Sequence, residues 1–209
     1  MKELERIIKD IDEFLKVKDE VREVVIRECR DVIREAGYVV TYIHTRELSK
    51  AKEVLSNLRE RVSRLKELVK DHPEIKYSGT VYSALSEYVE AEIFTSIILE
   101  GRIPSHKELG IHPVPYLQGL LDVVGELKRV AIESVREYRL SDAWRYLSIA
   151  EEIFRLCKGL DYPEALIPSV RRKTDIARNI VESLRSFLTD IELRLKLIKS
   201  MNEFKEKLK

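Results

Sequence analysis

The sequence predicts an all-α protein, and three observations carry that prediction. Apolar residues recur at steps of three and four along most of the chain, which is the spacing of one face of a helix. The helix breakers are sparse and clustered, with 7 Gly and 6 Pro in 209 residues. No stretch shows the alternation of apolar and polar residues that is typical of a strand. We therefore expect a single domain over residues 1–209, built as a bundle of about six to seven helices.

The first segment is expected to form one long helix that ends near Ile43. At 1.5 Å per residue this helix is about 60 Å long, which is enough to pack against more than one neighbour. Gly37 inside it costs roughly 1 kcal/mol relative to alanine unless another group approaches closely there. The apolar stripe is interrupted only near Lys18. It consists of Leu4, Ile8, Ile11, Leu15, Val21, Val25, Cys29, Val32, Ala36, Val39 and Ile43.

Proline and glycine mark the limits of the other helices. The segment before Asp71-His72-Pro73 has to stop there, because the residue before a proline is pushed out of the helical region. Gly101 followed by Pro104 is typical of a helix C-terminus, and Ser105 with Glu108 is typical of a capped helical turn. Residues 110–115 are expected to form a stiff connector. The expected helices cover residues 47–69, 81–100, 116–138, 141–158 and 169 to near the end.

Charge and hydropathy exclude several classes of protein. The 38 Lys and Arg nearly balance the 37 Asp and Glu, so binding of nucleic acid through bulk positive charge is excluded and any such binding must be local. No apolar stretch approaches the roughly 20 residues that span a bilayer, and the N-terminus lacks the apolar core of a signal peptide. We expect a soluble, cytoplasmic protein without a membrane partner, in which Cys29 and Cys157 are buried thiols.

Carboxylates are the candidate chemical groups, because the four histidines are scattered and no phosphate-binding loop or nucleophile motif occurs. Glu87 and Glu90 are three residues apart, so both point from one side of their helix, and Glu90 borders its buried stripe. Asp122 and Glu126 are four residues apart in the next long helix. If the two helices face each other, the four carboxylates converge and offer the oxygen ligands that Mg²⁺ or Mn²⁺ prefers.

Two glycines, Gly119 and Gly125, flank Asp122. Each costs a helix interior roughly 1 kcal/mol relative to alanine, which indicates room for another backbone or for a ligand. A plainer explanation of the acidic residues stays open. Acidic pairs at helical spacing are expected in any helix rich in Glu, and Glu126, Arg129 and Glu133 can form an exposed ladder of ion pairs.

Several segments resemble the translin family, and more closely its translin-associated protein X (Trax) branch. Residues 86–91, Ser-Glu-Tyr-Val-Glu-Ala, are similar to a Gln-Glu-Tyr-Val-Glu-Ala run of Trax. Residues 115–135 are similar to a family block, Asp-Tyr-Leu-x-Gly followed by Gly-Glu-Leu-x-Arg and Asn-Ser-Val, in which Glu133 replaces the Asn. Residues 169–173 are similar to a Ser-Leu-Arg-Lys-Arg run of translin, and residues 14–43 to the long first helix of the family. The resemblance therefore covers nearly the whole chain.

The resemblance implies a translin-like α-superhelix that assembles into hollow, usually eight-subunit particles around single-stranded RNA or DNA. Trax-like subunits are Mg²⁺-dependent endoribonucleases. Glu87, Glu90 and Asp122 fall on their catalytic positions, and Glu126 falls on a nearby fourth acidic position. Translin lacks the second glutamate and is the non-catalytic partner, so Glu90 is the residue that separates the two branches.

Basic residues are concentrated at the C-terminal end, where residues 169–209 hold 11 Lys or Arg and 6 Asp or Glu. Arg171, Arg172 and Lys173 are candidate phosphate contacts, with a solvated helix end as the alternative, and Arg129 is a further candidate. The leading hypothesis is a homo-oligomer, with an octameric shell as the implied form, that cleaves single-stranded RNA with Mg²⁺ or Mn²⁺. The alternatives are a non-catalytic, translin-like binder of single-stranded DNA or RNA and a helical scaffold without a nucleic-acid role.

Overall fold

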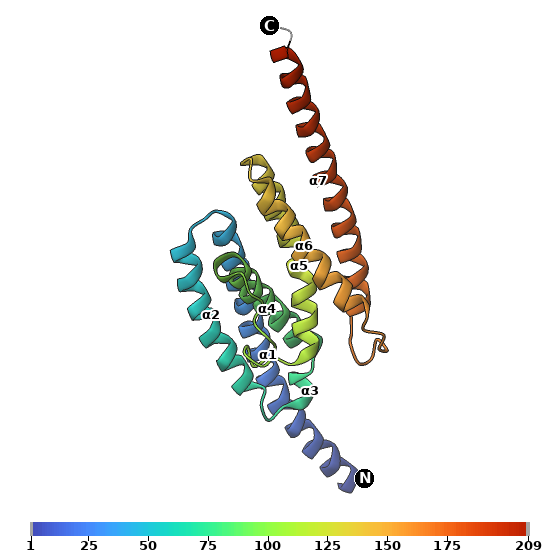
Figure 1. Cartoon of the computed structure of the whole chain (residues 1–209). Coiled ribbons are helices and arrows are strands. Elements are labelled where there is room, and N and C mark those ends of the chain that lie inside the picture. Colours follow the sequence, from blue (N-terminus) through green and yellow to red (C-terminus); the bar gives the residue numbers. More distant parts are fainter. Residues whose placement is uncertain (1, 208–209) are drawn as a thin grey trace. The chain divides into compact units, whose positions relative to one another are not determined.

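A computed structural model of the chain describes residues 2–207 (Figure 1). Within those residues the chain consists of helices without a strand, so the predicted all-α fold is confirmed. The helices are α1 (Lys2–His44), α2 (Leu48–Leu68), α3 (Pro73–Lys76), α4 (Gly79–Glu100), α5 (Pro113–Arg136), α6 (Leu140–Lys158) and α7 (Val170–Lys207). None of these helices has the length and apolar character needed to cross a membrane.

The described chain divides into two compact units, one up to Gly119 and the other from Leu120 onward. The division falls inside α5, whose first turns belong to the first unit. The single domain expected over residues 1–209 stays a prediction, because the helices of one domain can also separate into two such units.

In the first unit, α1 packs against both α2 and α4. Its buried face is the second part of the predicted stripe, from Val25 to Ile43. Helix α4 is the most buried helix of the unit, and its core residues include Leu85, Val89 and Phe94. A helix that is apolar on all sides has to be covered on all sides, which explains why α4 is central.

The first part of α1 differs from the second part. The helix is continuous as predicted, but Leu4, Ile8, Ile11 and Leu15 are 48–59% exposed. The apolar stripe therefore continues beyond the residues that α2 and α4 cover. At Gly37, no atom of the described chain lies within 4 Å of the position that a Cβ would take, so no close approach accounts for this glycine.

Most helix ends lie where the sequence places them. The Oγ of Ser78 caps α4 by accepting a hydrogen bond from the N–H of Val81 at 3.4 Å. Gly101 ends the helix with φ of 72°, a left-handed conformation that glycine adopts without a steric cost. Ser105 and Glu108 cap one another as predicted, since each side chain accepts a hydrogen bond from the backbone N–H of the other.

Two helix starts differ from the prediction, and proline explains both. Helix α3 begins at Pro73, where the sequence indicates only the end of the preceding helix. Helix α5 begins at Pro113, so the expected connector over residues 110–115 is helical in its second half. Proline ends a helix that precedes it, but it is also favoured in a first turn, where no backbone N–H is needed.

The second unit contains the remainder of α5 together with α6 and α7. Helices α6 and α7 pack against each other, and the buried positions of α7 end at Leu188. Lys128 of α5 donates a hydrogen bond to the Oγ of Ser183 in α7 at 2.9 Å. Cys157 in this unit and Cys29 in the first are buried free thiols, as predicted, and burial raises the pKa of each thiol to about 11.

Candidate metal and nucleic-acid site

Glu87 and Glu90 lie on α4 with partly exposed side chains. Their neighbours in the sequence are buried, so the two glutamates lie on the less buried side of α4. Each glutamate also takes part in a polar interaction with the surrounding chain. The predicted placement of this pair, on one side of a helix and beside its buried stripe, is confirmed.

The start of α5 approaches α4 directly beside these glutamates. A Cβ at Gly119 would lie 2.4 Å from the backbone oxygen of Ser86 and 2.8 Å from the Cβ of Val89. Any residue other than glycine at this position would force the two helices apart. Of the two roles that the sequence allows for Gly119, room for another backbone or for a ligand, the structure supports the first. The approach fixes the part of α4 that carries Glu87 and Glu90.

Asp122 in α5 forms an ion pair with Lys173 in the first turns of α7. The Nζ of Lys173 donates to Oδ1 of Asp122 at 2.6 Å and also contacts Oδ2. The side chain of Asp122 is 25% exposed and that of Lys173 is 21% exposed. Burial raises the pKa of Asp122, although the hydrogen bond and charge of Lys173 and the charge of Arg172 act in the opposite direction. The carboxylate that the sequence predicts as a metal ligand therefore already forms an ion pair with a lysine of the protein.

The other predicted residues of the second unit are one carboxylate and three arginines. Glu126 is partly buried, and its Oε2 is 3.9 Å from the Nη1 of exposed Arg129, which is a weak ion pair. Arg171 and Arg172 are exposed at the start of α7. The guanidinium groups of these three arginines are therefore open to a ligand from solvent. At Gly125, nothing among the described residues lies within 4 Å of the position of a Cβ.

The four candidate carboxylates are divided between the two units, with Glu87 and Glu90 in the first and Asp122 and Glu126 in the second. Over residues 2–207, no group of three or more His, Cys, Asp or Glu side chains is arranged to hold a metal ion. The donor chemistry fits Mg²⁺, which prefers carboxylate oxygens. Their convergence on one ion stays a prediction.

An ion pair between a buried carboxylate and an exposed arginine in the first unit was not predicted. Glu92 of α4 is only 3% exposed, and both its carboxylate oxygens accept hydrogen bonds from Arg59 of α2, at 2.6 and 2.7 Å. The sequence offers one signal, a single charged residue within the otherwise uncharged run of residues 91–97. The partner could not be inferred because it lies 33 residues earlier in the chain.

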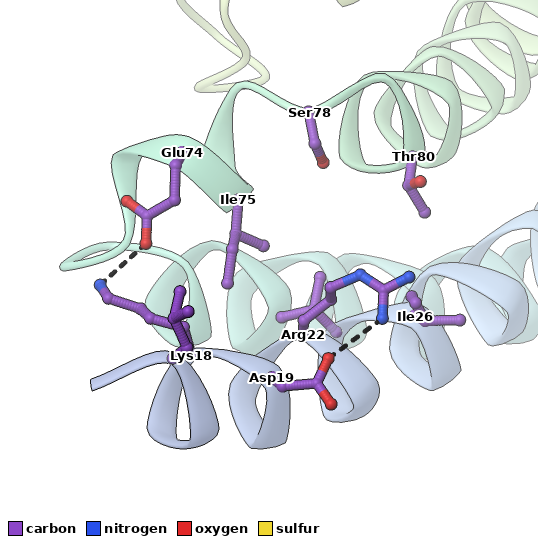
Figure 2. A pocket seen from close by; sticks show the side chains of 10 residues that line it. Lys18, Asp19, Arg22, Ile26, Glu74, Ile75, Ser78 and Thr80 are labelled. Atoms are coloured by element: carbon purple, nitrogen blue, oxygen red, sulfur yellow. Dashed lines mark hydrogen bonds and ion pairs between the residues drawn. The ribbon is translucent and has the colours of Figure 1, made fainter. Parts of the chain in front are cut away.

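A cavity of about 560 Å³ opens between α1, α3 and the start of α4 (Figure 2). The Nζ of Lys18 lies 2.8 Å from Oε1 of Glu74, and the Nη1 of Arg22 lies 3.3 Å from Oδ1 of Asp19 (Figure 2). The cavity has the size of a small-molecule site. Because each of these cations has an acidic partner at the same cavity, its charge gives no preference for an anionic ligand.

These features define a class of protein, an all-α chain in which two helices meet at a glycine beside a pair of half-buried glutamates. The chain belongs to the translin family, whose family model matches residues 20–195. It is 31% identical to the uncharacterized protein MJ0175 of Methanocaldococcus jannaschii over 187 residues, which is 87% of this chain and 82% of that protein.

Three solved structures have a similar fold. The crystal structure of AfC3PO is 26% identical with a TM-score of 0.81, and the complex of AfC3PO with duplex RNA is 25% identical with the same TM-score. Each match covers 90% of this chain and 97% of the other chain. Apo-NeC3PO is 22% identical with a TM-score of 0.78, over 87% of this chain and 95% of the other. These similarities confirm the predicted translin-like fold.

Proposed function

We propose that the chain binds nucleic acid and is a Trax-like, Mg²⁺- or Mn²⁺-dependent endoribonuclease that acts on single-stranded RNA. The similarity to AfC3PO, which has been solved with duplex RNA, supports the nucleic-acid part of the proposal. One observation carries the catalytic part. Glu90, the glutamate that distinguishes the Trax-like motif, lies partly buried on the same side of α4 as Glu87, beside the close approach of α5 at Gly119.

In this proposal Glu87, Glu90 and Asp122 supply oxygen ligands to the ion, and Glu126 binds the ion or orients a water. The chemistry that Mg²⁺ supplies is a lowered pKa of an attacking water and stabilisation of negative charge on the phosphate. Lys173 has to leave Asp122 before that carboxylate can become a ligand. Once released, its ammonium group is available to a phosphate of the strand.

Exposed residues support the proposed partners. Arg129, Arg171 and Arg172 present guanidinium groups to solvent, which suits contacts with phosphates. A homo-oligomer, in the form of an octameric shell, would cover apolar side chains that the single chain exposes at the first part of α1 and the last part of α7. These include Leu4, Ile8, Ile11, Leu193, Leu197 and Phe204.

The test is cleavage of a single-stranded RNA in Mg²⁺, in Mn²⁺ and in EDTA. We expect cleavage that requires the metal and falls by about 100-fold or more in Glu90→Gln and Asp122→Asn, because each substitution removes a charged ligand. Glu100→Gln is the matched control. Glu100 lies on the same helix but is exposed and paired with Arg102, so its substitution should leave cleavage unchanged.

The other outcomes separate the alternatives. Unchanged cleavage in Glu90→Gln and Asp122→Asn would overturn the proposed site. Salt-dependent binding of the strand without cleavage at any metal concentration would favour the non-catalytic, translin-like alternative. If the chain binds neither single-stranded RNA nor single-stranded DNA at low salt, both the nuclease and the non-catalytic binder are contradicted. The helical scaffold is then the remaining alternative.

A further inference from the structure

A second cavity of about 560 Å³ lies in the first unit, between the end of α2, α3, the start of α4 and the segment over residues 106–112. Four lysines and one glutamate are among the described residues that line it. They are Lys66, Lys70, Lys76, Lys107 and Glu67. The charged groups at this cavity therefore carry a formal net charge of about +3. This surplus is local, because the whole chain has a net charge of only +1.

One wall of this cavity is aromatic. The rings of Tyr82 and His112 are stacked, with their centroids 5.6 Å apart and their planes at 27°. Tyr77 meets both rings edge-on, at 6.4 Å from Tyr82 and 5.9 Å from His112. Tyr77 is 53% exposed, so much of its ring remains available to a ligand. This arrangement offers an aromatic surface on which a planar group can stack.

Hydrogen bonds hold the histidine of this wall in place. Its Nδ1 lies 3.3 Å from the backbone N–H of Val114, which donates to it, and 3.2 Å from the hydroxyl of Tyr82. Acceptance at Nδ1 assigns the ring proton to Nε2. Burial and the nearby charges of Lys76 and His106 lower the pKa of His112. The ring is therefore neutral at pH 7 and can stack without adding charge.

Two lysines are oriented by contacts within the cavity. Lys66 donates a hydrogen bond to the backbone oxygen of Gly110 at 2.8 Å, which leaves two of its three N–H groups for other acceptors. The Nζ of Lys76 lies 5.5 Å from the centre of the Tyr77 ring, which is a cation–π contact. In the cavity of Figure 2, Lys18 and Arg22 each have an acidic partner. In this cavity, by contrast, Lys66 contacts a backbone carbonyl and Lys76 contacts an aromatic ring.

We propose that this cavity binds a nucleotide, with the base stacked on Tyr77 beside Tyr82 and His112 and the phosphate held by Lys66 and Lys107. Phosphate and an aromatic face occur together in a nucleotide, and the cavity offers a surface for each. A cationic ligand is disfavoured by the lysines. A base within a duplex is also disfavoured, because its faces are already stacked.

The nucleotide can be free or can belong to a single strand. Binding of a nucleotide within a strand extends the proposed function and rests on it. Binding of a free nucleotide is independent of the proposed function. The cavity is formed without Glu87, Glu90, Asp122 and Glu126. Binding here is therefore separable from cleavage.

The experiment measures two probes with the full chain, AMP by ligand-observed NMR and a fluorescent single-stranded oligonucleotide by anisotropy. Tyr77→Ala should weaken AMP binding by about tenfold through lost stacking, and Lys107→Ala should weaken it through lost charge. Tyr77→Phe keeps the ring and should retain binding. The matched controls are Tyr138→Ala, which removes a tyrosine that is 94% exposed, and Lys52→Ala, which removes an exposed lysine of α2 outside the cavity.

A third probe, ribose 5-phosphate, carries the phosphate without the base. Its binding should fall in Lys107→Ala and remain unchanged in Tyr77→Ala, which assigns the base to the aromatic wall. If Tyr77→Ala weakens the binding of AMP and of the oligonucleotide to a similar extent, the result would support binding of a nucleotide within the strand. If Tyr77→Ala weakens the binding of AMP alone, the result would support a site for free nucleotides.

The results that would overturn the nucleotide site differ from those that would overturn the proposed function. If Tyr77→Ala and Lys107→Ala bind both probes as the wild type does, the nucleotide site is overturned, even when the oligonucleotide still binds and is cleaved. If the oligonucleotide neither binds nor is cleaved but AMP binding depends on Tyr77, the proposed function fails and the nucleotide site stands.

Discussion

Helix α4 and the part of α5 after Gly119 both carry a carboxylate with a basic partner, but the two pairs differ in kind. Glu92 is almost fully buried and is held by two hydrogen bonds from the planar guanidinium of Arg59. Asp122 is a quarter exposed and contacts the ammonium group of Lys173. Arginine fixes a carboxylate in one geometry, whereas lysine is a point charge on a flexible stem. The pair of Glu92 with Arg59 is therefore suited to stabilise the fold. In the pair of Asp122 with Lys173, the carboxylate can more readily exchange the lysine for another cation.

The glycines of α5 show the same difference. Gly119 lies against the backbone of α4, whereas Gly125 has no atom of the described chain within 4 Å of its Cβ position. The start of α5 is therefore in close contact with α4 at Gly119, whereas the side of α5 that carries Gly125 has space for a methyl group. Three sets of variants test whether the two regions differ in this way.

The largest effect is expected for Arg59→Ala. This substitution leaves the carboxylate of Glu92 buried without its partner, which should lower the free energy of unfolding by about 3 kcal/mol. Urea unfolding followed by circular dichroism measures the change. Arg102→Ala is the control, since Arg102 forms exposed ion pairs with Glu100 and Glu108, and it should cost less than about 1 kcal/mol. Equal losses in the two variants would contradict a special role for the arginine that pairs with the buried carboxylate.

The next effect compares the two glycines directly. Gly119→Ala places a methyl group against the backbone oxygen of Ser86 and should destabilise the protein by about 2 kcal/mol. Gly125→Ala meets no neighbour and should stabilise it by up to about 1 kcal/mol, because alanine favours a helix. The same urea titrations provide the measurement. Changes of the same sign in both variants would refute the distinction between the two parts of α5.

The smallest effect is expected for Lys173→Met, at about 1 kcal/mol near neutral pH. Burial raises the pKa of Asp122 above its ordinary value, so this residue contributes stability below that ordinary pKa and loses it as pH rises through the raised value. Without Lys173 the pKa should rise further, because the ammonium group no longer favours the carboxylate.

The difference in stability between Lys173→Met and the wild type should therefore be small in acid and grow as the pH rises and Asp122 ionises. Unfolding at several pH values tests this trend, and an NMR titration of the Asp122 carboxyl carbon tests the shift. A pKa of Asp122 that stays the same or falls in the variant would show that Lys173 does not stabilise the carboxylate.

Local rules made much of the fold predictable. The continuous helix through Ile43 follows from the spacing of its apolar residues, and the end of α4 follows from a glycine that adopts a left-handed conformation. Helix α3 was missed because proline is compatible with both the end and the start of a helix. The exposure of Leu4 was not predictable, since periodicity identifies an apolar face without indicating what covers it.

The candidate site was predictable to the same extent. The shared side of Glu87 and Glu90 depends only on a step of three residues, and the sequence also identified Gly119 as a position of close approach. The pair of Glu92 with Arg59 and that of Asp122 with Lys173 join residues 33 and 51 positions apart. Such contacts depend on how the helices pack, which helical spacing does not encode.

The two buried cysteines have a consequence for oxidative chemistry. A thiol with a pKa of about 11 holds almost no thiolate at pH 7, and the thiolate is the form that reacts with peroxides and disulfides. Cys29 and Cys157 are the only cysteines of the chain. The two thiols of the folded protein should therefore react slowly with oxidants and disulfides, and no reducing agent should be needed to protect them.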